Sequence, residues 1–397
     1  MYHGSKNIVS IILLLLSSWS FAQKDLQRTS ERDIEAKTYA FYQTKEWSKL
    51  LAFGDSALQQ NTDYYYLRFR MGVANYELGK YLTAKKHFRK AIEFNSTAEI
   101  STRYLYMCYQ YTGEYEQARK LAKTLTTHSQ NILGYDPNRM LNYVGFLPGL
   151  KASGSVDVPI ASLLGVSVGH NIFNDVSVNH VLSNYSQGND IWGYNQKEYF
   201  LQVNIPLKKS ALFSASYHFV DGNTTFYYNG FEQTANAKSH AISLFVNRQI
   251  GNHNFALGSI GLEVDTIFQM QHDFGYSFFP KSNTDVVFGI KGYIHSRDFY
   301  DNIFFSALPY VSFKPTKKLS VFASYLWNNG NNIAEWNGFI LNNSPDLTAG
   351  KFTLNASYQI HSQWNLGLTF EQEKKQSELV TNYTYNSIYL SLKYIPK

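Results

Sequence analysis

The chain has 397 residues, a formal net charge of +6 and an aromatic content of 16%, with 31 tyrosines and 28 phenylalanines. The positive charge is spread along the chain without long basic blocks, which argues against a nucleic-acid partner. The single cysteine, Cys108, excludes an intramolecular disulfide framework, and we expect it to be a buried apolar residue on a helix. Few soluble enzymes are so rich in tyrosine, whereas outer-membrane barrels carry aromatic girdles at both lipid interfaces.

The N-terminus has the pattern of a secretory signal peptide over residues 1–22. Lys6 precedes an apolar run over residues 8–16, and a small-x-small site follows at residues 20–22. The run is short for a membrane-spanning helix, which needs about 20 residues, so a retained anchor is the disfavoured alternative. No later stretch approaches that length. A membrane protein with this sequence would therefore have to be a β-barrel.

Residues 30–128 have helical apolar spacing and repeat every 34 residues. Gly79 and Gly113 are separated by this interval. The same offset relates Tyr81 to Tyr115 and Ala84 to Ala118. Paired helices with a 34-residue period indicate tetratricopeptide repeats. We therefore predict a helical repeat domain over residues 23–130, with three repeats of which the outer two are degenerate.

Such a stack either docks a partner on its concave surface or packs as a spacer, and the sequence leaves both interpretations open. Its tyrosines can line a groove or fill the space between repeats. Tyr65, Tyr104 and Tyr109 are the candidate partner-binding residues. Asn131, Asp136 and Pro137 then break the helical pattern, so residues 131–138 are predicted to be a linker.

Residues 139–397 alternate apolar and small polar side chains with the two-residue period of strands. In residues 351–370 the pattern runs through Phe352 to Ile360, restarts at Trp364 and predicts an antiparallel hairpin. The polar face carries mostly Ser, Asn, Thr, Gln and Gly, where a soluble sandwich would carry many Lys and Glu. An apolar face opposite such residues is typical of a barrel with lipid outside and a polar lumen. A soluble periplasmic β-sandwich is the alternative.

Connection lengths also favour a barrel, because short periplasmic turns should alternate with longer outside loops. Long polar connections are expected over residues 221–237, 296–302, 328–350 and 372–383, although the one near Asp265 is short. Residues 141–146, 162–170 and 176–182 complete the strands at the start of the barrel. The alternation gives about 12 to 14 strands, with both barrel ends in the periplasm.

The middle repeat and the domain order resemble a known family. Gly72, Gly79, Tyr81, Ala84, Phe88 and Ala91 match the small and aromatic positions of a tetratricopeptide repeat. A signal peptide, such repeats and a C-terminal barrel together resemble the YaiO-type outer-membrane proteins, and the layout is similar to that of exopolysaccharide exporters. The resemblance implies an outer-membrane location with the repeats in the periplasm, and a role in export or assembly of a surface polymer.

Chemical motifs are weak. Ser216 and His218 share one face of a strand, which is the minimum for a lipid hydrolase, but they share it with Ser214, so lumen hydrogen bonds are the favoured interpretation. The eleven histidines form no cluster with carboxylates, and no phosphate-binding glycine loop is present, so we predict no catalytic, cofactor or metal site. The three consecutive rings Phe226, Tyr227 and Tyr228, within residues 224–231, can stack on sugars or anchor the chain at the lipid interface.

We therefore predict an α+β protein of two domains, in which an all-α tetratricopeptide-like domain precedes an antiparallel transmembrane β-barrel of about 12 to 14 strands. The protein is not an enzyme in this interpretation. It would contact outer-membrane lipid, dock a periplasmic protein and handle a glycan in export or assembly of a surface polymer. The alternative is a structural anchor or assembly component of a secretion or envelope complex with a closed lumen. A lipid hydrolase is a third hypothesis.

Overall fold

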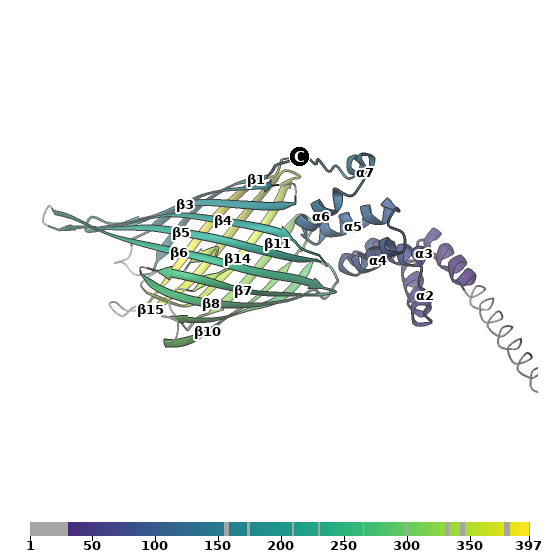
Figure 1. Cartoon of the computed structure of the whole chain (residues 1–397). Helices are drawn as coiled ribbons and strands as arrows, with labels where there is room; N and C mark the ends of the chain where they lie inside the picture. Colours follow the sequence, from purple (N-terminus) through teal and green to yellow (C-terminus); the bar gives the residue numbers. More distant parts are fainter. Residues whose placement is uncertain are drawn as a thin grey trace, which may run out of the picture. The chain divides into compact units, whose positions relative to one another are not determined.

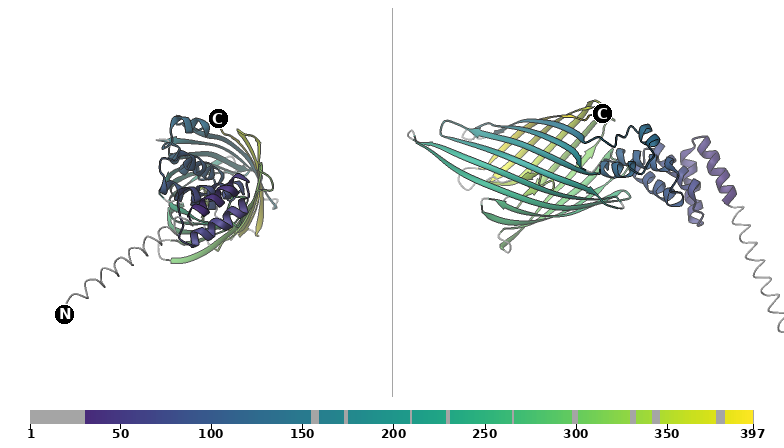
Figure 2. Two further views of the ribbon diagram at one scale, coloured as in Figure 1. Left: turned by 90° about the vertical axis from the view of Figure 1, so that its right-hand side faces the viewer. Right: turned by 45° about the horizontal axis from the view of Figure 1, so that its top comes forward.

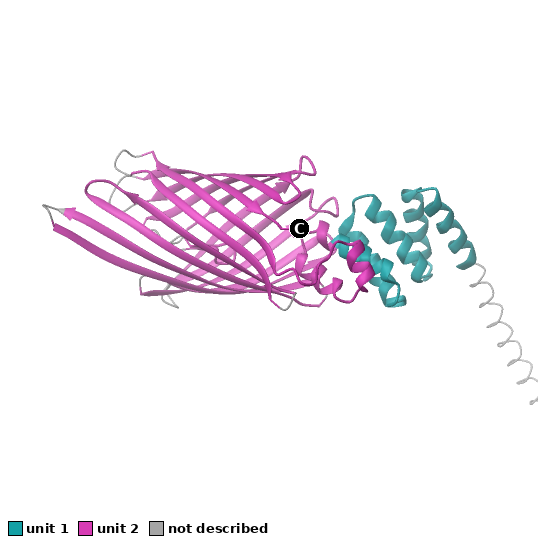
Figure 3. Cartoon of the chain, turned by 90° about the horizontal axis from the view of Figure 1, so that it is seen from above, with its two compact units in different colours: residues 1–108 teal, residues 109–397 magenta. Residues whose placement is uncertain are grey.

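The computed structural model describes residues 31–154, 159–172, 175–208, 210–228, 231–264, 266–297, 301–329, 333–341, 346–376 and 382–396. The predicted signal peptide, residues 1–22, lies outside them. The chain divides into two compact units, residues 1–108 and 109–397 (Figure 3). No helix in the described part of the chain is long and apolar enough to cross a membrane.

The N-terminal part of the chain is helical. After a helix over residues 31–43 come α2 (Trp47–Gln59), α3 (Tyr65–Glu77), α4 (Tyr81–Phe94), α5 (Glu99–Tyr111), α6 (Tyr115–Ala122) and α7 (Thr127–Ile132). The second compact unit thus contains α6 and α7 as well as every strand (Figure 3).

The turns between paired helices share one backbone geometry at the predicted spacing. Lys45, Gly79 and Gly113 have φ angles of 57°, 71° and 77°. Each turn closes with the same helix-ending bond between a backbone N–H and the carbonyl five residues earlier: Glu46 to Phe41, Lys80 to Asn75, and Glu114 to Tyr109. The first repeat therefore keeps the glycine conformation even though lysine replaces glycine there. The identity of these units as tetratricopeptide repeats stays a prediction.

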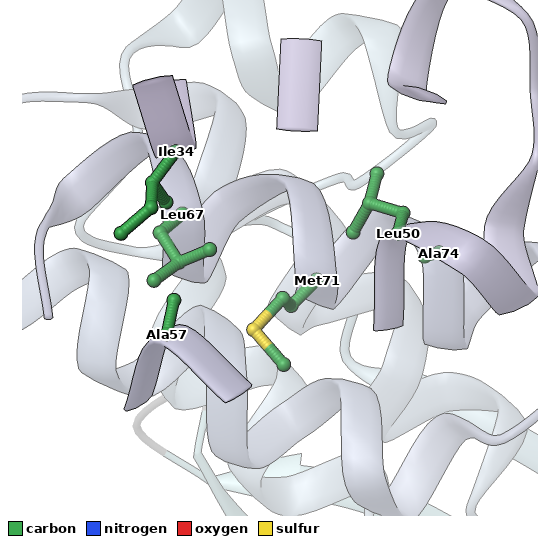
Figure 4. Close-up of a cluster of buried hydrophobic side chains, with 6 residues drawn as sticks. All are labelled: Ile34, Leu50, Ala57, Leu67, Met71 and Ala74. Atoms are coloured by element: carbon green, nitrogen blue, oxygen red, sulfur yellow. The ribbon is translucent and has the colours of Figure 1, made fainter. Parts of the chain in front are cut away.

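The helices of the first unit pack around small residues and rings. A buried cluster joins the first helix, α2 and α3, and Figure 4 shows its six side chains: Ile34, Leu50, Ala57, Leu67, Met71 and Ala74. Further along, Gly72 lies so close to Phe88 that an added Cβ would be 2.6 Å from the ring. The glycine thus lets α3 and α4 approach, as the sequence pattern predicts.

Two basic side chains of α4 are buried in this unit. Burial, and then the charge of Arg89, lower the pKa of Lys85 to about 7. Burial also lowers the pKa of His87 to about 4, with a smaller contribution from Arg68, whose guanidinium donates to His87 Nδ1 at 3.4 Å. Lys85 and His87 therefore keep their protons up to a higher pH in the unfolded chain than in the folded chain. Their contribution to stability therefore rises with pH from about 4 to 10.

Replacing Lys85 by methionine should accordingly stabilise the helical unit at pH 7. We expect the free energy of unfolding to rise by on the order of 3 kcal/mol, because folding no longer requires the chain either to bury an ammonium group or to release its proton. The gain should shrink towards pH 10, where the lysine of the unfolded chain also begins to lose its proton. Urea unfolding followed by circular dichroism checks this, with the exposed neighbour Lys86→Met as the control. An equal gain at both pH values would contradict the prediction.

The C-terminal part of the chain is a closed antiparallel barrel of 14 strands (Figure 1). The strands are β1 (Leu141–Ser153), β2 (Ala161–Ile172), β3 (Val176–Gly188), β4 (Trp192–Pro206), β5 (Ala211–Tyr228), β6 (Phe231–Ile250), β7 (His253–Val264), β8 (Ile267–Phe278), β9 (Val286–Arg297), β10 (Asp301–Phe313), β11 (Leu319–Trp327), β14 (Leu347–His361), β15 (Trp364–Gln376) and β16 (Tyr383–Tyr394). The count is the upper end of the predicted range.

Each strand pairs with its neighbour in the barrel order, and β1 pairs with β16 to close the ring. In the predicted hairpin Leu354 lies opposite Phe370 and Tyr358 opposite Leu366, so the apolar residues of β14 and β15 share one face. Between β11 and β14 the chain forms a separate two-stranded sheet of β12 (Ala334–Glu335) and β13 (Ile340–Leu341).

The first of the predicted loops is wrong. Residues 221–228 and 231–237 are strand rather than an open connection, because β5 continues to Tyr228 and β6 begins at Phe231. Their hairpin projects past the neighbouring strands at one end of the barrel (Figure 2, right). Beyond the lipid a strand needs no apolar face, so the polar composition of this segment hides its regular pairing.

Candidate functional site

The two faces of the barrel wall differ in chemistry as predicted. Apolar side chains on the outer face remain exposed, for example Leu354, Ile360 and Leu368 at 40%, 52% and 49%. On the inner face of the same two strands, Lys351, Glu373 and Lys375 are charged and buried. An apolar exterior around a polar interior is the arrangement of a membrane-spanning barrel.

The barrel lumen contains a β-hairpin, which we call the lumen hairpin, residues 333–341. It consists of Ile333, β12, a turn over residues 336–339 and β13. Ile333 and Ala334 are fully buried and Glu335 is 1% exposed. Trp336, Asn337 and Gly338 all have positive φ, at 49°, 64° and 81°. Asn-Gly is the dipeptide that best tolerates this backbone, so the sequence itself sets the turn.

Side chains from several strands of the barrel wall form hydrogen bonds with the hairpin backbone. Ser216 of β5 and Ser243 of β6 each donate to the carbonyl of Asn337 at 3.0 Å, and their hydroxyls also contact each other. His218 Nδ1 donates to the carbonyl of Gly338 at 2.9 Å. On β8, Gln271 donates to the carbonyl of Ala334 at 2.6 Å and accepts from its N–H at 3.0 Å. The turn and the first hairpin strand are therefore hydrogen-bonded to three wall strands.

Apolar contacts complete the packing. Trp336 lies edge-on to Tyr310 and Phe322, with ring centroids 5.9 and 5.5 Å away. Phe339 lies edge-on to Phe200 at 5.1 Å. Two buried clusters cover the hairpin strands: Ala334 and Leu341 with Ala241, Phe245, Ile260, Leu262 and Val264, and Ile333 with Tyr293, Leu308 and Leu326. The hairpin thus packs against the inner wall of the barrel through two buried apolar clusters and its rings.

Charged side chains hold the hairpin from the other side. Glu335 forms an ion pair with Lys351 of β14, and both side chains are almost fully buried, at 1% and 5% exposure. Lys291 of β9 donates to Asn337 Oδ1 at 3.2 Å, and its ammonium lies 4.5 Å from the Trp336 ring centroid.

The same wall carries a second charged cluster next to Lys351. Glu373 of β15 pairs with Lys151 of β1 and with Lys375, each at 2.9 Å, and accepts a bond from Thr348 at 2.5 Å. Buried ion pairs of this kind are strongly destabilising when one partner is removed. Lys351, the ion-pair partner of the hairpin, therefore lies beside a cluster of charged side chains on the barrel wall.

The predicted location of this hairpin is wrong. A polar outside connection is expected over residues 328–350, but residues 333–341 lie inside the barrel. The missed wall residues are apolar and face inward, namely Ile260, Leu262, Leu308 and Leu326. Two signals could have revealed them: strands that are apolar on both faces, and the Asn337-Gly338 turn between the apolar residues Trp336 and Phe339.

The structure places Ser216 and His218 on the inner face, as the strand period predicts. Each donates to a different carbonyl of the lumen hairpin. His218 Nε2 lies 3.4 Å from Glu198 Oε2. Both side chains thus hold the hairpin and face away from lipid. Within the described ranges, no group of three or more His, Cys, Asp or Glu side chains is placed to hold a metal ion.

The three predicted partner-binding tyrosines have different surroundings. Tyr65 is half-buried, stacks on Phe69 at 6.1 Å and contacts the Ser101 hydroxyl at 3.2 Å. Tyr104 is half-buried and stacks on Phe88 at 5.1 Å. Tyr109, which belongs to the second unit, is 7% exposed. The role of these tyrosines in partner binding stays a prediction.

Helix α6 is bound to the barrel rim that carries the turns after β2 and β4. Gln117 donates to the carbonyl of Ala211 and Lys120 to that of Pro206, both at 3.0 Å. Glu116 accepts from Ser177 at 2.8 Å. Because these bonds reach the ends of β3, β4 and β5, α6 is part of the barrel unit.

Several solved structures are similar to this chain. The toluene transporter TodX of Pseudomonas putida is 9% identical with a TM-score of 0.43, over 68% of this chain and 93% of TodX. Omp33 of Acinetobacter baumannii is 12% identical with a TM-score of 0.35, over 65% of this chain and all of Omp33. CdiB of A. baumannii is 11% identical with a TM-score of 0.39, over 63% of this chain and 60% of CdiB.

No protein-family model matches the sequence, and no curated protein sequence matches it. The fold assignment rests on the strand order of the barrel itself.

Proposed function

We propose that this chain is an outer-membrane barrel whose lumen is a conduit closed by the lumen hairpin, acting in export or assembly of a surface polymer such as a polysaccharide. The observation that carries the proposal is that the lumen hairpin is not part of the barrel sheet. Its two strands form a sheet of their own outside the barrel ladder, and wall side chains bind them. The hairpin can therefore leave while every pair of barrel strands stays intact.

The helical repeats would supply the periplasmic end of this function. In the proposal they dock a periplasmic partner, with Tyr65, Tyr104 and Tyr109 as candidate contacts, and bring its cargo to the lumen. The bonds of α6 to the ends of β3, β4 and β5 support it, because they attach this one helix of the predicted repeat region to the barrel. The resemblance to YaiO-type proteins and a periplasmic location of the repeats belong to the same proposal.

The second candidate is an anchor or assembly component with a permanently closed lumen. The near-complete burial of Ile333, Ala334 and Glu335 favours it, because a packed plug stabilises a barrel without having to move. A lipid hydrolase at Ser216 and His218 has less support, because both side chains are bonded to the hairpin inside the barrel.

A reversible disulfide discriminates conduit from anchor. An ideal Cβ on Gly338 would lie 3.6 Å from Ser243 Cβ, within the range that a disulfide spans. Ser243→Cys with Gly338→Cys, in a Cys108→Ala background, should therefore lock the hairpin to β6. The conduit predicts that oxidised cells lose the surface polymer and that a reductant restores it, while the polymer level of either single-cysteine variant does not change between oxidant and reductant. If cells in which the disulfide has formed completely keep their surface polymer, the conduit hypothesis is wrong and the anchor hypothesis remains.

A further inference from the structure

The lumen hairpin places a carboxylate where the cargo of a conduit would pass. Glu335 pairs with Lys351, and both are nearly fully buried. In the conduit proposed above, on which this inference rests, the hairpin leaves and Lys351 loses its partner. A lumen ammonium that has lost its ion-pair partner favours an anionic occupant. We propose that the hairpin occupies the binding site of a carboxylated sugar polymer, with Glu335 in the place of a uronate carboxylate.

Neighbouring charges add to this preference. With the hairpin absent, the ammonium groups of Lys151, Lys351 and Lys375 would face the carboxylates of Glu371 and Glu373 on this part of the wall. Glu373 is already shared between Lys151 and Lys375. Lys351 is the one that loses its direct ion-pair partner, Glu335, when the hairpin leaves. Three ammonium groups then face two carboxylates, so one carboxylate from the cargo would restore the balance.

The rest of the vacated site suits sugar rings and hydroxyl groups. Tyr310 and Phe322, which pack against Trp336, would present two ring faces or edges to the cargo. Ser216, Ser243 and His218 would turn their donors from hairpin carbonyls to sugar oxygens. Hydroxyl groups can both donate and accept, so a polyol satisfies such a wall in many registers.

An acidic polypeptide is the competing occupant, and the barrel disfavours it. The closed ladder has no free strand edge, so an extended peptide could not add itself as a strand. Only a few wall side chains bind the hairpin backbone now, so the wall would offer an extended peptide few hydrogen bonds beyond those that water already provides. A sugar polymer carries no such backbone.

The test uses the full chain with residues 334–341 replaced by a glycine-serine linker, reconstituted in planar bilayers. The probes are an oligomer of glucuronic acid, the glucose oligomer of the same length and linkage, and a glutamate oligopeptide. We expect the glucuronic acid oligomer to block the current at about tenfold lower concentration than either comparator. Lys351→Gln should bring the blocking concentrations of the glucuronic acid and glucose oligomers to about the same value. Lys374→Gln, on the outer face of β15, should leave their tenfold difference unchanged.

Equal block by the glucose oligomer would overturn the charge assignment, and equal block by the peptide would overturn the polymer class. If the linker variant fails to fold, the same probes are applied to the full-length Glu335→Gln, Trp336→Ala double variant, with the same expected order. The block reports the site in the opened barrel, whereas the disulfide lock reports the use of the intact barrel. Failure of this inference and failure of the proposed function are therefore distinguishable.

Discussion

Replacing Glu335 by alanine should open the barrel. Lys351 would then be buried beside the hairpin without its counter-charge, and breaking one side of a buried pair costs about 3–5 kcal/mol. The open state recovers much of this cost, because water reaches Lys351 once the hairpin leaves. At about 1.4 kcal/mol per tenfold change, the ratio of open to closed barrels should rise by about a hundredfold or more. Single-channel recordings in planar bilayers measure that ratio directly.

A matched set of variants separates the ion pair from general damage to the barrel. Glu335→Met with Lys351→Met removes both charges, so we expect its open fraction to be close to that of the native protein. Lys374→Met removes a lysine from the outer face of β15 and should change little. A Glu335→Ala barrel that stays closed would show that the apolar packing of the hairpin, and not its ion pair, keeps the lumen shut.

The barrel could be predicted from the sequence because its outer face obeys one local rule. In β14 to β16, lipid-facing residues such as Leu354, Leu366 and Leu390 recur at every second position whatever lies inside. The β5–β6 extension could not be predicted in this way, because beyond the lipid both faces of a strand meet water. The two strands pair regularly, from Asp221 opposite Lys238 to Tyr228 opposite Phe231. Their side chains nevertheless show no alternation of apolar and polar residues.

The candidate site was harder to predict because its contacts join distant parts of the chain. Ser216, His218 and Gln271 look like ordinary lumen residues until residues 333–341 are placed against them. Composition alone made residues 328–350 an outside loop, since polar residues flank the short apolar hairpin. The burial of Glu335 depends on Lys351, which lies 16 positions later and on a barrel strand. No local period encodes such a pair.

In the helical unit, the local sequence pattern predicts the helix pairs, whereas contacts between helices decide which side chains are buried. The spacing of Gly79 and Gly113 predicted the helix pairs, and Lys45 adopts the same positive φ despite its side chain. Which rings become core was left open by the sequence. The structure buries Phe88 completely and stacks Tyr104 on it at an interplanar angle of 11°. Half-buried Tyr104 is thus positioned by a core residue of the preceding helix pair.

Phe88→Ala should consequently be the most damaging single substitution in this packing. The Phe88 ring is fully buried, contacts Phe69 and Tyr104, and fills the space that Gly72 leaves free. Loss of a buried phenylalanine ring costs about 3–5 kcal/mol, part of it from the cavity left behind. Urea unfolding of the full chain in detergent, followed by the helical circular dichroism signal, should show this loss.

Tyr66→Ala is the control, because Tyr66 is 55% exposed and its ring contacts only the edge of Tyr65 and the guanidinium of Arg70 among the ring and cation contacts of the described residues. We expect it to cost less than about 1 kcal/mol. The comparison also bears on partner docking. If Tyr104 binds a partner, Phe88→Ala should weaken capture of that partner by removing the ring that orients Tyr104, even in urea-free buffer where the barrel is intact. Undiminished capture together with the expected loss of stability would assign Tyr104 to the packing between repeats.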